Sequence, residues 1–315
     1  MDIDILLMLQ NFRAVIGDAL TPFMEKISFF AVYYLLIIPA FLYWCVDKRT
    51  GVYTFAAYTA GNAVNSAVKL TVCAPRPWIR DARIQPAGDS IRTATGYSFP
   101  SGHSVTAATL YGGMAVCARK MMRWISVLCV ILILLTDFSR NYLGVHTPQD
   151  VLVGLTEGAL MLLGVSAVFK YIAKHPEKEN RILAAGILIG LALLVYITVK
   201  PYPVIENVNP EKMKRDGYGD VGRWIAFCLG RMIEQKWIRF EPVSSKRCLA
   251  AGLVGSAIVY FMLEIMWPPM ISLLGAHWGT FAANMVVFLF ILSLWPLVLK
   301  AVQKNEHEQR QPDKH

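Results

Sequence analysis

Charged residues are scarce in this sequence, and no segment alternates polar with apolar residues over the length of a strand. Only 17% of the 315 residues are charged, whereas 55% are hydrophobic. Soluble domains carry about 25% charged residues, so the composition excludes an ordinary soluble protein. The lack of alternation disfavours a transmembrane β-barrel, in which every second residue faces lipid. The composition therefore predicts an α-helical membrane protein.

Disulfide and metal patterns are also missing. The six cysteines form no C-x-x-C pair and stand mostly in apolar runs, so they predict small apolar fillers. Carboxylates, histidines and cysteines nowhere cluster at metal-ligand spacing, and we expect neither a metal nor another cofactor. No small-residue cleavage site follows a short apolar core near the start, so a removable signal peptide is not expected.

Apolar runs of membrane-spanning length recur along the chain. A helix needs roughly 20 apolar residues to cross a bilayer core of about 30 Å. We therefore expect an all-α, polytopic transmembrane bundle of about eight or nine spans. The segment 222–235 is short and charged, and we expect it either to cross the membrane or to re-enter it. The spans are expected near 27–46, 52–70, 102–118, 124–138, 149–170, 182–199, 222–235, 247–266 and 279–300.

The chain divides into four parts at these spans. Residues 1–26 combine apolar clusters and charges at helical spacing, which is typical of a helix lying in the membrane interface. Residues 27–199 hold the first six expected spans, and 200–300 hold the remaining ones as a C-terminal extension. Residues 301–315 have the composition of a flexible tail.

The net charge of +9 could suggest nucleic acid as a partner. The positive residues, however, fall in short blocks between spans, such as 170–181 and 231–247, and this pattern sets orientation. We therefore expect no nucleic acid partner. The blocks and the C-terminus are predicted to be cytoplasmic, which leaves three polar segments together on the opposite side: "KLTVCAPRP" (69–77), "SFPSGH" (98–103) and "SRNYLGVHTPQD" (139–150).

Taken singly, the first two polar segments have ordinary explanations. Lys69 could reach from an apolar span to the interface, and Arg76 could be an interfacial cation. Ser101 is a plausible helix N-cap, and His103 could be a surface histidine. The free amides of such a helix start nevertheless bind anions, and phosphate is the commonest of them.

The third segment carries more chemistry. Thr147 can cap a helix whose first turn contains Asp150, four residues after His146. A carboxylate there can hold one imidazole nitrogen and leave the other free for a substrate. Arg140 adds a forked donor that matches phosphate oxygens. Together the three segments indicate phosphoryl transfer, which depends on positioning, cationic stabilisation and proton transfer.

The combined pattern resembles the three-part signature of the type-2 phosphatidic acid phosphatase superfamily. Its parts are Lys69, six residues, Arg76-Pro77; then Pro100-Ser101-Gly102-His103; then Ser139-Arg140, five residues, His146, three residues, Asp150. All three parts are complete and in order. The superfamily includes lipid phosphate, isoprenyl diphosphate, sphingosine-phosphate and glucose-6-phosphate phosphatases, together with bacterial acid phosphatases and vanadium haloperoxidases.

The resemblance implies a role for each matched position. His146 would be the nucleophile that forms a phosphohistidine, Asp150 would orient it, and His103 would be the general acid. The resemblance also implies a six-helix phosphatase core over about 27–199 and no metal. The phosphate oxygens would be held by Lys69, Arg76, Ser101, Gly102 and Arg140.

The expected function is hydrolysis of a lipid phosphate or diphosphate on the non-cytoplasmic side, with membrane lipids as surroundings and the lipid phosphate as partner. One alternative is a lumenal sugar-phosphate phosphatase. Another is an anion or lipid transporter or binding protein, although no internal repeat is evident. The linker 200–223 is expected on the catalytic side, either as a solvated connector or as a substrate entrance with Tyr202, Tyr218 and Asp220.

Overall fold

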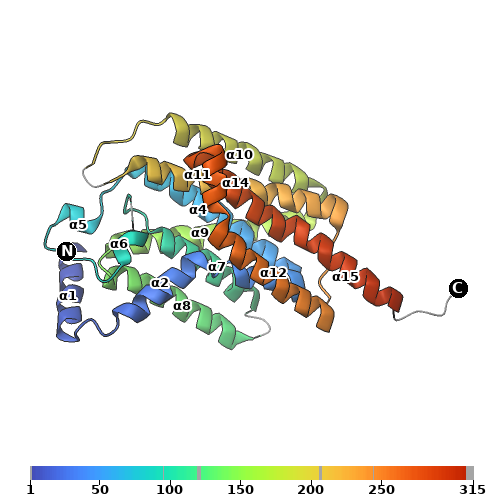
Figure 1. The fold of residues 1–315 in the computed structure, drawn as a ribbon, viewed down its shortest axis with the longest axis horizontal. Coiled ribbons are helices and arrows are strands. Elements are labelled where there is room, and N and C mark those ends of the chain that lie inside the picture. The colour runs from blue at the N-terminus through green and yellow to red at the C-terminus, as the bar shows by residue number, and fades with distance from the viewer. Residues whose placement is uncertain (1, 95, 119–121, 206–207, 244, 310–315) are drawn as a thin grey trace.

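The computed structural model describes residues 2–94, 96–118, 122–205, 208–243 and 245–309. Within these ranges the chain is helical and contains no strand, and its long helices pack into one bundle (Figure 1). The α-helices are α1 (Asp2–Val15), α2 (Thr21–Tyr33), α3 (Ile37–Cys45), α4 (Lys48–Val72), α5 (Pro77–Arg80), α6 (Ser90–Thr93), α7 (Gly102–Ala118), α8 (Arg123–Tyr142), α9 (Pro148–Lys174), α10 (Glu179–Val199), α11 (Pro210–Ile233), α12 (Lys246–Ile265), α13 (Trp267–Leu274), α14 (Ala276–Leu289) and α15 (Trp295–Gln309). One 3-10 turn, η1 (Pro176–Lys178), and two π-helical turns, η2 (Glu234–Ile238) and η3 (Phe290–Leu294), join neighbouring helices.

Five helical segments of the described chain are long and apolar enough to cross a membrane, and there are six if α2 and α3, bent by 48°, form one span. The five are Arg123–Tyr142, Pro148–Lys174, Pro176–Val199, Lys246–Ile265 and Ala276–Lys304. The all-α transmembrane architecture is therefore confirmed, whereas the expected total of eight or nine spans stays a prediction.

The helices α4, α7 and α11 are not among these five: α7 has only 17 residues, and α4 and α11 carry many polar residues because they lie inside the bundle. Their neighbours are other helices, so their buried polar side chains bond within the protein. The Thr106 hydroxyl of α7, for example, donates to Asn62 Oδ1 of α4 at 3.0 Å. The segment expected at 222–235 is part of α11, whose 24 residues extend about 36 Å, so it is long enough to cross the bilayer core.

Near both ends of the chain, the helices do not follow the expected segment boundaries. Figure 1 shows α1 lying across the ends of the long helices, as an interfacial helix would, but α2 already begins at Thr21, inside the expected segment 1–26. Helix α15 continues to Gln309, so the expected tail is helical over its first residues. The last part of that tail, 310–315, lies outside the described residues.

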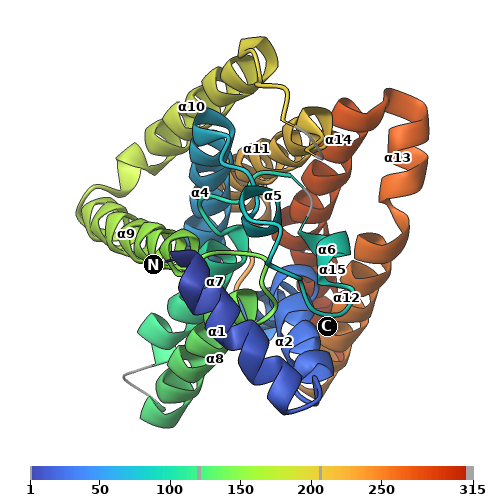
Figure 2. The ribbon, with the colours of Figure 1, turned by 90° about the vertical axis from the view of Figure 1, so that its left-hand side faces the viewer.

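The extension packs directly against α4 and α10 through α11, which lies between these two helices and α14 (Figure 2). Glycines allow the close approach. A Cβ atom on Gly222 would lie 2.7 Å from the carbonyl oxygen of Phe281 in α14, and one on Gly217 would lie 3.1 Å from side chains of Leu70 and Ile197. The extension therefore forms part of the same bundle.

At the end of α11 a buried carboxylate joins three segments of the chain. Glu234 is fully buried, and its two oxygens lie 2.8 Å from Lys48 Nζ and 2.7 Å from Arg231 Nη1. The carboxylate also accepts the backbone N–H of Phe240 at 2.9 Å. Since Lys48 begins α4, this network fastens the extension to the core.

Replacing Glu234 with glutamine is expected to lower stability by about 2 kcal/mol, because two mostly buried cations lose their shared counter-charge. The apparent melting temperature in detergent, followed by tryptophan fluorescence, should fall by roughly 5 °C. Glu241→Gln is the matched control, since Glu241 also pairs with Lys48 but is 79% exposed. An equal shift in both variants would contradict the role of the buried network.

Candidate active site

The three polar segments meet at one end of the bundle, where α4 ends and α7 and α9 begin. Backbone hydrogen bonds hold them together. The N–H of Ser98 donates to the carbonyl of Ala74 at 2.8 Å, and the N–H of Ser101 donates to the carbonyl of Asp150 at 2.9 Å. The structure thus brings together segments that lie up to 81 positions apart in the sequence, as the single-site hypothesis requires.

His146 and Asp150 form the centre of the site, and both are buried. Thr147 and Asp150 make a reciprocal capping box at the start of α9, with Thr147 N–H donating to Asp150 Oδ2 at 2.8 Å. The same carboxylate oxygen lies 3.5 Å from His146 Nδ1. The cap therefore fixes the carboxylate where it can orient the imidazole.

Ser98 is a site residue to which the sequence analysis gave no role. Its hydroxyl donates to Asp150 Oδ2 at 2.6 Å and lies 3.4 Å from His146 Nδ1. The only available signal was its position inside the segment "SFPSGH", because the contact depends on how the 98–101 loop folds over α9. Ser98 thus serves as a positioning residue for the carboxylate.

Arg76 defines which nitrogen of His146 faces the cations. Its Nη1 lies 2.9 Å from His146 Nε2 and donates to the carbonyl of Val145 at 2.9 Å, while its Nε donates to the carbonyl of Gly96 at 3.0 Å. Arginine has only donors, so Nε2 is the acceptor and the ring proton is assigned to Nδ1, toward Asp150. Burial, reinforced by the charge of Arg76, lowers the pKa of His146 well below its usual value. The imidazole is therefore neutral at physiological pH, and the lone pair on its unprotonated Nε2 accepts the hydrogen bond from Arg76.

Lys69 binds the backbone of the second segment. Its ammonium donates to the carbonyl of Pro100 at 2.6 Å and lies 3.4 Å from the carbonyls of Tyr97 and Ser98. The capping bond expected of Ser101 is present, because its hydroxyl accepts the N–H of Ser104 at 3.3 Å. Lys69 and the first turn of α7, including Gly102, are therefore adjacent.

His103 lies in that first turn and is partly exposed. It is near enough to interact electrostatically with Arg140, His146, Arg76 and Lys69. The described structure thus gathers both signature histidines and all three signature cations around one place.

Arg140 has unused hydrogen-bonding capacity. It is fully buried, and its Nη1 donates to the hydroxyl of Ser28 in α2, whereas Nε and Nη2 have no partner among the described residues. Buried donors are normally paired, and a guanidinium with two unpaired donor nitrogens is well suited to bind an anionic oxygen. Ser28 was missed, because nothing in the sequence shows that α2 packs beside α8.

An apolar groove of about 600 Å³ opens onto Arg140. Phe29 and Phe30 of α2 and Leu143, after α8, line it together with polar groups that include Lys26. Phe29 and Phe30 are both exposed. The buried cation–histidine cluster is thus connected to a surface that suits a hydrocarbon chain.

Of the three residues expected at a substrate entrance, Asp220 contacts the helix that carries a signature residue. It accepts from Ser66 of α4, the helix that carries Lys69. Tyr218 is buried with its hydroxyl 2.7 Å from that of Thr198, and the hydroxyl of Tyr202 donates to the carbonyl of Ile197 at 2.8 Å. Both tyrosines therefore hold the start of α11 and the linker against α10, and an entrance role for them stays a prediction.

Comparison with known proteins identifies the class. Residues 50–174 match the model of the PAP2 superfamily. Over 158 residues the chain is 27% identical to phosphatidylglycerophosphatase B of Bacillus subtilis (strain 168), covering 48% of this chain and 73% of that protein. Over 65 residues it is 37% identical to undecaprenyl-diphosphatase of Sulfolobus acidocaldarius, covering 21% of this chain and 30% of that protein. Over 139 residues it is 27% identical to lipid phosphate phosphatase delta of Arabidopsis thaliana, covering 41% and 33% of the two chains.

A solved structure is also similar, the crystal structure of the transmembrane PAP2-type phosphatidylglycerolphosphate phosphatase from Bacillus subtilis. It has a TM-score of 0.46 and 23% identity, and the match covers 54% of this chain and 85% of that one.

The chain is a hydrolase of the phosphatase class. The match of residues 50–174 to the PAP2 superfamily model, together with the similarity to phosphatidylglycerophosphatase B, confirms the resemblance drawn from the signature. All signature positions, from Lys69 to Asp150, lie inside the matched region, whereas the extension after 200 lies outside it.

Proposed function

We propose that the protein hydrolyses the phosphate or diphosphate of a membrane lipid through a phosphohistidine at His146. The observation that carries this proposal is Arg140, whose two unpaired donors lie where the buried cation–histidine cluster meets the apolar groove. A phosphate bound there would place its hydrocarbon part in the groove. The names of the relatives, which include a phosphatidylglycerophosphatase, an undecaprenyl-diphosphatase and a lipid phosphate phosphatase, support the same substrate class.

In the first chemical step, Nε2 of His146 attacks phosphorus with its lone pair. His103 is protonated when the anionic phosphate is bound; the bond between phosphorus and the lipid oxygen breaks, and that oxygen takes the proton from His103. Asp150 stabilises the positive imidazole through Nδ1–H, while Arg76 exchanges its contact with Nε2 for a phosphate oxygen. Lys69 and Arg140 balance the remaining charge of the phosphoryl oxygens.

In the second step, water attacks the phosphohistidine. His103, now neutral, accepts a proton from that water, the phosphorus–nitrogen bond breaks, and its electron pair returns to Nε2. Phosphate leaves, and both histidines regain their starting states. None of these proton or group transfers requires a group other than the residues named.

The site is proposed to face the periplasm, the extracellular space or a lumen, with the C-terminus in the cytoplasm. The support is geometric. Helix α9 begins at Pro148, beside the site, so about 33 Å of helix separate the site from the basic block that begins at Lys170 and continues past η1. Since such blocks are typical of the cytoplasmic side, the site belongs at the other side.

The test is phosphate release by detergent-purified protein in EDTA. The substrates would be phosphatidate, sphinganine phosphate, isoprenyl mono- and diphosphates, phosphatidylglycerophosphate and glucose 6-phosphate. We expect release from at least one lipid that persists under chelation. Preferred turnover of glucose 6-phosphate would overturn the lipid assignment, and loss of all activity in EDTA would overturn the metal-independent mechanism.

A further inference from the structure

Asp137 in α8 is a buried carboxyl group to which the chemistry above gives no role. Only 5% of the residue is exposed, and neither carboxyl oxygen has a hydrogen-bond partner among the described residues. Arg140, three residues on in the same helix, donates to Ser28 of α2 instead of pairing with it. Buried polar groups are normally paired, so a carboxyl group in this state requires an explanation.

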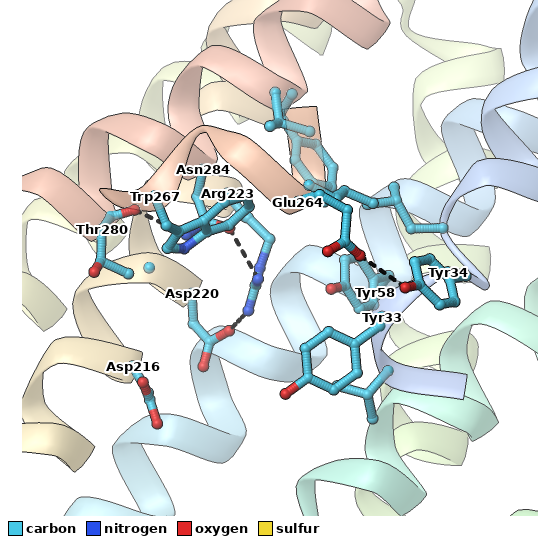
Figure 3. A pocket seen from close by; sticks show the side chains of 16 residues that line it. Tyr33, Tyr34, Tyr58, Asp216, Asp220, Arg223, Glu264, Trp267, Thr280 and Asn284 are labelled. Atoms are coloured by element: carbon cyan, nitrogen blue, oxygen red, sulfur yellow. Dashed lines mark hydrogen bonds and ion pairs between the residues drawn. The ribbon is translucent and has the colours of Figure 1, made fainter. Parts of the chain in front are cut away.

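Two other carboxyl groups of the long helices show the usual arrangement. They line a pocket of about 410 Å³ between α2, α4, α11, α12 and α14, where Figure 3 shows Asp220 paired with Arg223 and Glu264 joined to the hydroxyl of Tyr34. Such contacts offset the cost of placing a carboxylate away from water. Without them, Asp137 is stable in the bundle as the neutral acid, which has one proton to donate.

Ser104 of α7 is the neighbour that can receive this proton in a hydrogen bond. Its side chain and the carboxyl group of Asp137 are close enough to interact. The hydroxyl of Ser104 already donates to Ser101 Oγ at 2.9 Å, and a hydroxyl has a single proton to give. Asp137 can therefore join this chain as the donor to Ser104 and not as its acceptor.

The direction of the Ser104 hydroxyl differs from that of other hydroxyls in the helices. A serine or threonine inside a helix commonly donates to the carbonyl four residues earlier. Thr109 does so in the same helix, where it donates to the carbonyl of Val105 at 2.7 Å. With nothing to hold it, the proton of Ser104 could turn in the same way to the carbonyl of Pro100. A donor from α8 at the Ser104 oxygen would keep that proton directed at Ser101.

The proton of Ser101 is then available to the substrate. Ser101 is fully buried, and its Oγ accepts the hydroxyl of Ser104 at 2.9 Å and the N–H of Ser104 at 3.3 Å, so both of its lone pairs are used. Its own proton has no acceptor in the part of the chain that the structure describes. Since Ser101 is one of the positions expected to hold phosphate oxygens, the chain ends in a donor at the phosphate site.

We propose that Asp137 is a positioning residue, which as the neutral acid orients the hydroxyls of Ser104 and Ser101 so that Ser101 donates to the phosphate. The proposal rests on the proposed function and adds a residue outside the three-part signature to its phosphate site. Asp137 keeps its proton throughout the reaction and does not touch the substrate.

The test measures kcat/KM for the best lipid substrate, the dissociation constant of inorganic phosphate by titration calorimetry, and the apparent melting temperature. Asp137→Leu keeps the branched shape and removes the donor, so kcat/KM should fall and the dissociation constant should rise, each about tenfold. Its melting temperature should equal or exceed that of the wild type, because an unpaired polar group leaves the interior. Asp137→Asn retains a donor in its amide N–H and should stay within about threefold of the wild type in both constants.

Two further variants locate the effect. Ser104→Ala should reproduce the losses of Asp137→Leu, and the double variant should lose no more than either single variant, because both substitutions break one chain. Thr136→Val is the matched control. Thr136 is fully buried beside Asp137, but its hydroxyl donates within α8 to the carbonyl of Leu132 at 2.8 Å, so both constants should stay at the wild-type level.

Three results would overturn this inference and leave the proposed function standing. Equal losses in Asp137→Asn and Asp137→Leu would mean that the ionised carboxylate is required. A lower melting temperature that accompanies the lower activity of Asp137→Leu would make Asp137 a structural residue, and unchanged constants would remove it from the site. Failure of the wild type to hydrolyse any lipid phosphate would overturn the proposed function, whereas the dissociation constants of phosphate would still decide the role of Asp137.

Discussion

Replacing His146 with alanine is expected to lower kcat/KM for the best lipid substrate by about 10⁴-fold or more, as loss of a nucleophile does in other covalent hydrolases. The structure supports this size of effect, because His146 Nε2 is the neutral, cation-facing nitrogen of the site and lies 2.9 Å from Arg76. No other histidine of the described site has a carboxylate partner that could stabilise the positive charge formed on attack.

The intermediate provides the direct measurement. With substrate labelled at the phosphoryl group and rapid quenching in base, the wild type should retain an acid-labile label, and His146→Ala should retain none. His146→Gln is the companion variant, since it fills more of the buried space and limits unfolding. His175→Ala is the control, because His175 follows α9 at its other end and its side chain is 43% exposed. Equal labelling of His146→Ala and wild type would assign the nucleophile to another residue.

The sequence predicted the centre of the site because that information is local. The spacing from His146 to Asp150 places the carboxylate in the first turn of α9, and the capping box at Thr147 keeps it there. Charged side chains at the ends of apolar helices are costly unless they have a function, so the three polar segments could be recognised without a structure.

Contributions from α2 could not be predicted in the same way. Ser28 meets Arg140 only because α2 packs along α8. Such contacts depend on tertiary packing, and no periodicity in residues 21–33 encodes the partner.

Hydropathy alone is also a poor guide to the position of the helices at the centre of the bundle, because their buried surfaces include polar residues. Helix α4 is largely buried, and its polar residues, such as Asn62 and Ser66, bond to α7 and α11 instead of facing lipid. A helix surrounded by protein has no need to be apolar on all sides. The position of α4 was predictable from its length and flanking charges, but its central place was not.

The second large effect is expected for His103→Ala, and its size should depend on the leaving group. A general acid contributes roughly 10² to 10⁴-fold when the departing oxygen is a poor leaving group, as a lipid alcohol is. The variant should therefore lose about 10³-fold in kcat/KM on the lipid phosphate. With p-nitrophenyl phosphate the leaving group needs no proton, so kcat/KM should fall by less than about tenfold.

The His103→Ala variant should also allow the two steps of the reaction to be observed separately. His103 is also the base that activates water, so the phosphohistidine formed from p-nitrophenyl phosphate should break down slowly. We expect a burst of nitrophenol equal to the enzyme concentration, a low steady rate and accumulation of labelled enzyme, whereas the wild type shows no burst under the same conditions. Equal losses on both substrates, or absence of the burst, would contradict a proton-transfer role and leave His103 as a residue that only binds phosphate. Its position in the first turn of α7, within the field of Lys69, Arg76 and Arg140, suits either role, and the leaving-group dependence decides between them.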